Sequence, residues 1–70
     1  MQTKLIKILH DRNMKYKDLA HILNISEKQL GLKINGKVPF KSNEMFAISD
    51  YFKMKLDDIF LPSMYENGTN

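Results

Sequence analysis

Hydrophobic positions recur along the chain at intervals of three and four residues, the spacing that places side chains on one face of an α-helix. The first such stripe consists of Met1, Leu5, Ile8 and Leu9. The second consists of Leu19, Ala20 and Leu23. The pattern predicts a first helix that ends near Asn13, a residue suited to a left-handed helix end, and a second helix from Lys15 to residue 22 or 23.

End signals mark a third helix. Ser26 followed three residues later by Gln29 matches a capping box, in which each side chain bonds a backbone amide at the start of a helix. Asn24 fits the preceding turn, and Gly36 ends the helix. At about 100° per residue, Leu30 and Ile34 share a face that we expect to point inward. The opposite, outward stripe contains Lys28, Leu32 and Asn35, with Glu27 and Gly31 on its flank.

Two further helices follow a loop around Pro39. A fourth stripe at helical spacing contains Met45, Ile48, Ser49 and Phe52, and it predicts a helix that starts near Lys41 or Ser42. The segment from Leu56 to Phe60 predicts a last short helix that Pro62 stops. The predicted fold is all-α, a compact bundle of five short helices in one domain over residues 1–61. Residues 62–70 are expected to form a polar, frayed tail.

Length and composition limit the chain to one small domain. Its 70 residues contain no cysteine, so neither a disulfide nor a thiolate metal site is expected to support the core. No signal peptide or membrane span is recognisable, and we expect a soluble, cytoplasmic protein.

Charge is distributed unevenly along the chain. Residues 1–41 carry nine Lys/Arg and three Asp/Glu, a net charge of +6, whereas residues 42–70 carry two and five, a net charge of −3. The basic half fits a polyanion partner and equally fits a solvated lysine surface.

The two helices within residues 15–36, joined by a short turn, have the outline of a helix-turn-helix. Here the sequence resembles the lambda-repressor-like, Cro/C1-type (XRE) regulators, especially small phage-encoded members. "DLAHILNIS" is similar to the second helix and turn of that family, "LKINGK" to the end of its recognition helix and "LDDIF" to its final helix. The resemblance covers roughly residues 4–60 in order and spacing. It implies a DNA-binding domain that places the recognition helix, about residues 27–35, in the major groove of double-stranded operator DNA.

Within that frame, the outward side of the recognition helix is expected to read bases. The candidate base-reading residues are Glu27, Lys28, Gly31 and Leu32. A leucine can pack on a thymine methyl, glycine permits close approach, and a glutamate can accept from a cytosine amino group. Each also has a simpler explanation: Gly31 can relieve crowding at a helix crossing, Leu32 can be an ordinary surface residue, and Glu27 can complement the helix N-terminus.

A second group is expected to contact the DNA backbone, or else to form a solvated surface. It consists of Tyr16, Lys17, Asn35, Gly36, Lys37, Lys41 and Asn43. Two residues depart from the family pattern near the start of the second helix, where Lys15 and Tyr16 replace the usual Ser/Thr and Gln. The family glutamine orients on a phosphate and supports the recognition helix, so Tyr16 must act through its hydroxyl or not at all. Lys53 stands where a glycine commonly ends the fourth helix.

Catalysis has little support in the sequence. His10 and His21 lie on different predicted helices without a nucleophile beside them, and the pair Asp57–Asp58 fits the start of the last helix. The five methionines, at positions 1, 14, 45, 54 and 64, fit core filling better than a metal or cofactor site. We expect no enzyme, cofactor or metal.

The leading interpretation is therefore a sequence-specific transcriptional regulator resembling a phage Cro-like protein or short repressor. The alternatives are a helix-turn-helix used as a protein-interaction module, as in an antirepressor, and a nonspecific DNA-bridging protein. An apolar cluster near the end of the chain fits a homodimer interface, although Ile59 and Phe60 fit a fold-stabilising role equally well. It contains Ile59, Phe60, Leu61, Met64 and Tyr65.

Overall fold

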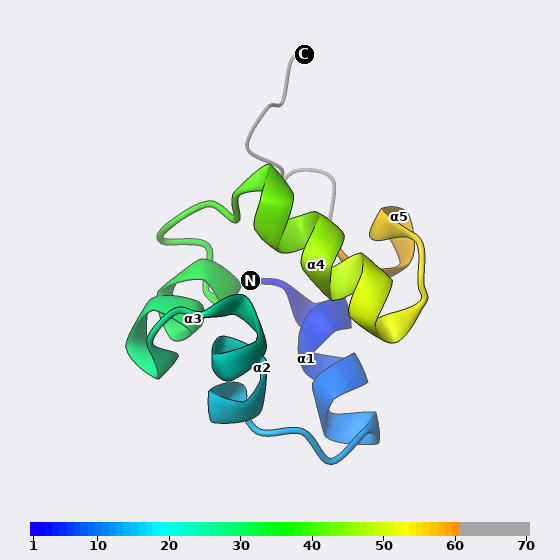
Figure 1. Cartoon of the computed structure of the whole chain (residues 1–70), viewed down its shortest axis with the longest axis horizontal. Coiled ribbons are helices and arrows are strands. Elements are labelled where there is room, and N and C mark those ends of the chain that lie inside the picture. Colours follow the sequence, from blue (N-terminus) through cyan, green and yellow to red (C-terminus); the bar gives the residue numbers. More distant parts are fainter. Residues whose placement is uncertain (61–70) are drawn as a thin grey trace.

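The computed structural model describes residues 1–60, and this part of the chain forms five α-helices (Figure 1). They are α1 (Thr3–Asp11), α2 (Tyr16–Leu23), α3 (Glu27–Ile34), α4 (Ser42–Phe52) and α5 (Leu56–Ile59). The all-helical prediction is confirmed, and each observed helix lies within a residue or two of the expected one. The predicted domain limit at residue 61 and the predicted tail lie outside the described residues.

The first four helices end in the same backbone motif. A residue with positive φ follows each helix: Asn13 (56°), Asn24 (59°), Gly36 (84°) and Lys53 (57°). The next residue's N–H donates to a carbonyl five positions back, as Met14 does to Leu9 and Lys37 does to Leu32. This pattern satisfies carbonyls that a helix end leaves unpaired. The predicted end signals at Asn13, Asn24 and Gly36 are confirmed, and Lys53 adopts the conformation for which glycine is usual.

Side chains near the helix starts accept the free backbone N–H groups. Ser26 Oγ accepts from the Gln29 N–H at 3.0 Å, which confirms the serine half of the predicted capping box. At the start of α2, the Asp18 carboxylate accepts from the backbone N–H of Lys15 at 2.9 Å. Both bonds fix where a helix begins, and they also place negative charge or an acceptor near its positive end.

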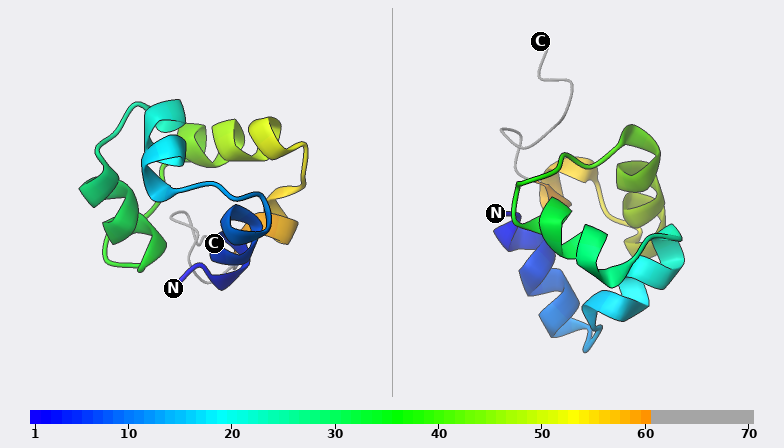
Figure 2. Two further views of the ribbon diagram at one scale, coloured as in Figure 1. Left: turned by 90° about the horizontal axis from the view of Figure 1, so that it is seen from below. Right: turned by 90° about the vertical axis from the view of Figure 1, so that its left-hand side faces the viewer.

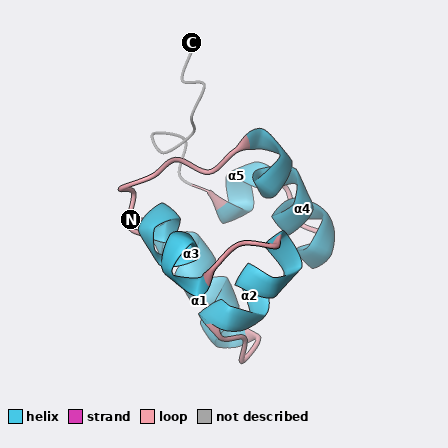
Figure 3. Ribbon diagram, turned by 60° about the vertical axis from the view of Figure 1, so that its left-hand side comes forward, coloured by secondary structure: helices cyan, strands magenta, loops and turns pink. Residues whose placement is uncertain are grey.

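The core joins all five helices. Its buried apolar residues are Leu5, Leu9, Leu19, Ala20, Leu30, Ile34, Phe40, Met45, Ile48, Phe52, Ile59 and Phe60. Helix α2 packs against α3 and α4, whereas α5 packs against α1 and α4 (Figure 3). In the right-hand view of Figure 2, α3 lies at the front, and no other helix of the described chain covers its outer side. The fold therefore holds α3 by one face and leaves the other accessible.

One prediction about the first stripe is wrong. Met1 is 58% exposed and does not fill the core, whereas the neighbouring Gln2 is buried. The reason is a backbone contact: the Gln2 N–H donates to the Ile34 carbonyl at 2.8 Å, which draws residue 2 against the end of α3. Among the other methionines, Met45 is buried and Met14 and Met54 pack against the core, as predicted.

Candidate nucleic-acid interface

Helix α3 is held against α2 by a tight turn and by buried side chains. Asn24, in the left-handed conformation, reverses the chain, and Ser26 caps the new helix two residues later. Leu30 and Ile34 are both fully buried, so the predicted inward face of α3 is confirmed. Residues 16–34 thus form a helix-turn-helix whose second helix presents its opposite face to solvent.

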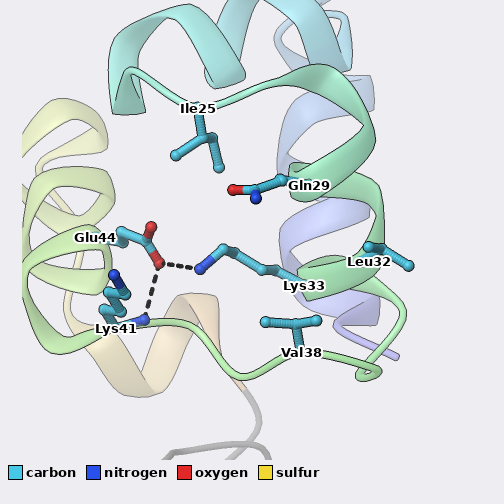
Figure 4. Close-up of a pocket in the computed structure, with 7 residues that line it drawn as sticks. All are labelled: Ile25, Gln29, Leu32, Lys33, Val38, Lys41 and Glu44. Carbon is cyan, nitrogen blue, oxygen red and sulfur yellow. Dashed lines mark hydrogen bonds and ion pairs between the residues drawn. The ribbon is translucent and has the colours of Figure 1, made fainter.

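The outward face of α3 carries the predicted base-reading residues. Glu27 and Lys28 are exposed, whereas Gly31 and Leu32 are partly buried. Leu32 is less open than predicted because the chain folds back after Gly36, and the N–H groups of the following residues, Lys37 and Val38, donate to the Leu32 carbonyl. In Figure 4 its side chain still points away from the interior of the domain. All four residues lie on the accessible side of one helix.

Within residues 1–60, a side chain at Gly31 would meet open space. Apart from its two chain neighbours and the adjacent backbone of its own helix, a Cβ atom built at this position has no heavy atom within 4 Å. Its backbone has ordinary helical geometry, since Gly31 lies within α3 and is not among the residues with positive φ. The explanation that Gly31 relieves crowding at a helix crossing is therefore wrong. Glycine in a helix interior costs about 0.5–1 kcal/mol relative to alanine, and nothing within the described chain compensates for that cost.

A hollow of about 240 Å³ lies between α3 and the start of α4. Its lining consists of Ile25, Gln29, Leu32, Lys33, Val38, Lys41 and Glu44 (Figure 4). The ammonium of Lys33 and the carboxylate of Glu44 meet at 2.8 Å on its inner side, and both side chains are buried. Neither residue stood out in the sequence. The available signal was the helical phase of Lys33, which borders the inward face of Leu30 and Ile34.

A family model of the Cro/C1-type helix-turn-helix DNA-binding domain matches residues 4–61. The chain belongs to this family. The match confirms the resemblance carried by the helix-turn-helix, and DNA binding is the activity that membership supports. Comparison with curated proteins and with solved structures gave no match.

The residues expected to contact the DNA backbone flank α3 on two sides of the Cro/C1-type domain. Tyr16 and Lys17 lie in the first turn of α2, whereas the others follow α3 or lie at the start of α4. Lys17, Asn35, Gly36, Lys37, Lys41 and Asn43 are exposed. Tyr16, the first residue of α2, is partly buried and packs against the core, so its ring supports the fold. The phosphate contacts themselves stay predictions.

The apolar cluster proposed as a dimer interface divides into two parts. Ile59 and Phe60 are completely buried in the Cro/C1-type domain, so they form its core and are not available to a second chain. Their assignment to an interface is corrected in favour of the fold-stabilising role. Leu61, Met64 and Tyr65 lie outside the described residues.

The two histidines, His10 and His21, are both exposed. Asp57 and Asp58 occupy the first turn of α5, where their charge complements the helix N-terminus. Within residues 1–60, no helix of this domain is both long enough and apolar enough to cross a membrane.

Proposed function

We propose that this Cro/C1-type domain is a sequence-specific transcriptional regulator that reads double-stranded DNA through α3 in the major groove. It acts as a phage-type Cro-like protein or short repressor, which occupies an operator and blocks polymerase. The proposal needs an accessible helix that can approach base edges closely, with cations placed for phosphates on both sides.

The observation that carries this proposal is the open space around Gly31. The missing side chain benefits no neighbour within the described chain, and Gly31 flanks the outward stripe of α3. Close approach of the helix backbone to the edges of base pairs gives the glycine a purpose, because a methyl group there would stand between helix and DNA. The cost to helix stability is then offset in the complex.

The neighbouring side chains suit three kinds of base contact. Glu27 can accept from a cytosine amino group, Lys28 can donate to guanine O6 and N7, and Leu32 can cover a thymine methyl. Contacts with the phosphates would fix the register of the domain on the duplex. The residues that would make them are the exposed Lys17, Lys37 and Lys41, together with Tyr16, Asn35, Gly36 and Asn43.

Two-fold symmetric operators would need two copies of the domain. A homodimer, formed in solution or only on DNA, would use Leu61, Met64 and Tyr65 beyond the buried Phe60. Sedimentation of the protein with and without a selected duplex distinguishes the two forms.

A second candidate function is supported by the hollow beside α3. Ile25, Leu32 and Val38 give its lining an apolar part, and Val38 is itself 38% exposed. Such a surface suits an antirepressor-like module that binds another regulator through the same face.

Selection from a random pool of duplexes, followed by mobility-shift titration at two salt concentrations, separates these functions. The proposed function predicts an enriched sequence that binds at least about a thousandfold more tightly than a scrambled duplex. Equal binding to both duplexes would indicate a nonspecific DNA-bridging protein. An absence of binding to either would favour the protein-interaction module.

A further inference from the structure

A buried ion pair connects the recognition helix to the next helix. Lys33 lies in the last turn of α3 and Glu44 in the first turn of α4, and their Nζ and Oε1 atoms are 2.8 Å apart. The side chains are only 5% and 9% exposed. Figure 4 shows them pointing toward each other across the hollow. By contrast, the ion pairs Lys7–Asp11, His10–Asp11 and Lys53–Asp50 involve side chains that are more than half exposed.

The Glu44 carboxylate joins three parts of the domain. Its Oε1 atom accepts from the Lys33 ammonium and also from the backbone N–H of Lys41, at 2.9 Å. The Lys33 ammonium in turn contacts the carbonyl of Pro39 at 3.5 Å. The end of α3, the loop after it and the start of α4 therefore meet at one carboxylate. That loop and that helix start carry the proposed phosphate contacts Lys37 and Lys41.

Stability alone is a weak reason for burying such a pair. Removing two charges from water is costly, and a pair of this kind contributes little more than well-packed apolar side chains of similar volume. An ion pair does require one relative placement of its two helices, whereas apolar side chains can slide past one another. Here the two helices differ in their proposed role, since α3 reads bases and the start of α4 contacts phosphates.

We propose that Lys33 and Glu44 are positioning residues that set the register between the base-reading face of α3 and the phosphate contacts of the loop and α4. The inference rests on the proposed sequence-specific function, because register matters only when base edges are read. Both side chains are buried and leave no charge free for a phosphate. Their effect is therefore on discrimination between sequences and not on the number of counterions that binding releases.

The test replaces the pair without leaving a lone buried charge. In the double variant Lys33→Met/Glu44→Gln, methionine retains the length of the lysine stem and the glutamine oxygen can still accept from the Lys41 N–H. A matched control is Lys7→Met/Asp11→Asn, which removes the exposed ion pair of α1 with the same change in charge. The probes are a duplex selected from a random pool by the parent protein and a scrambled duplex of equal composition.

If the pair has this positioning role, the double variant folds. Its ratio of affinity for the selected duplex to affinity for the scrambled duplex falls about tenfold, comparable with one mismatched base pair. The slope of log K against log salt is the same for the double variant as for the parent protein. The control variant keeps the parent's affinity ratio between the two duplexes. Glu44→Asp alone, which keeps both charges but shortens the carboxylate side chain by one methylene, gives a smaller loss. If the double variant fails to fold, this single variant decides the question.

An unchanged ratio in the folded double variant, or in Glu44→Asp when that variant must decide, overturns the positioning role while leaving the proposed function intact. A parent protein that binds both duplexes equally overturns the proposed function and this inference together. The same titrations therefore separate the two failures.

Discussion

The ring of Phe60 packs edge-on against the ring of Phe40, with centroids 5.2 Å apart and planes inclined by 63°. Phe40 ends the loop that follows the recognition helix, and Phe60 directly follows α5. Both side chains are almost completely buried. The last helix therefore anchors the loop that presents Lys37 and Lys41, although the two segments are 20 residues apart in the sequence.

Phe60→Ala should lower the free energy of unfolding by about 3–5 kcal/mol, because it removes buried area and leaves a cavity beside Phe40. Phe46→Ala is the matched control, since the Phe46 side chain is 61% exposed and its loss should cost no more than about 0.5 kcal/mol. Urea denaturation followed by circular dichroism measures both. Similar losses in the two variants would show that Phe60 is not a core residue.

Lys53→Gly should raise the free energy of unfolding by about 1 kcal/mol. Lys53 holds a φ of 57°, a left-handed conformation in which a Cβ atom meets steric strain that glycine avoids. Asn13→Gly, at a similar φ of 56°, should gain less because asparagine tolerates this region better. Thermal denaturation of both variants provides the comparison, and a loss of stability in Lys53→Gly would contradict it.

The helix ends could be predicted because their signals are local. Asn13, Asn24 and Gly36 act through their own backbone conformation and the hydrogen bonds of a few adjacent residues. Leu30 and Ile34 could be placed inside for a similar reason, since helical phase depends only on spacing within one helix. The same phase placed the candidate base-reading residues on the outward face of α3.

Features set by contacts between distant segments could not be predicted. The burial of Lys33 depends on Glu44, which lies across a loop on another helix, and a lysine is rarely buried without such a partner. Met1 has the character of a core residue, yet the hydrogen bond between Gln2 and Ile34 places it at the surface. Phe60 could not be assigned to the core or to an interface until its contact with Phe40 was known.

Three single substitutions test the proposed phosphate contacts: Lys17→Ala, Lys37→Ala and Lys41→Ala. Each should weaken binding to the selected duplex and to the scrambled duplex by a similar factor. If each lysine contacts one phosphate, the slope of log K against log salt should fall in magnitude by about one unit per variant. Lys7→Ala, an equally exposed change on α1, is the control and should keep the slope. A loss limited to the selected duplex, with an unchanged slope, would exclude the phosphate assignment.

Leu32→Ala should reduce discrimination for thymine at one position of the selected sequence, because the contact with the C5 methyl is lost. Since Leu32 is only partly buried, stability should fall by no more than about 1 kcal/mol. Uracil at that position should weaken parent binding similarly and cause little further loss in the variant, and this non-additivity identifies the pair in contact. If the losses caused by Leu32→Ala and by uracil were fully additive, Leu32 would not contact that thymine methyl group.

The most direct test of base reading by α3 is Gly31→Ala, measured for stability and for binding to the selected and scrambled duplexes. Because a Cβ atom at this position has open space around it in the described part of the chain, alanine should raise the free energy of unfolding by up to about 1 kcal/mol. Lys53→Gly serves as a variant stabilised to a similar degree away from α3, and its affinity ratio between the duplexes should match that of the parent.

Gly31→Ala should give a more stable protein whose affinity for the selected duplex falls by about tenfold, while binding to the scrambled duplex changes little. Stability and specific binding would then move in opposite directions because of one methyl group. A Gly31→Ala protein that is more stable and binds the selected duplex as tightly as the parent would contradict the claim that this face of α3 reads DNA.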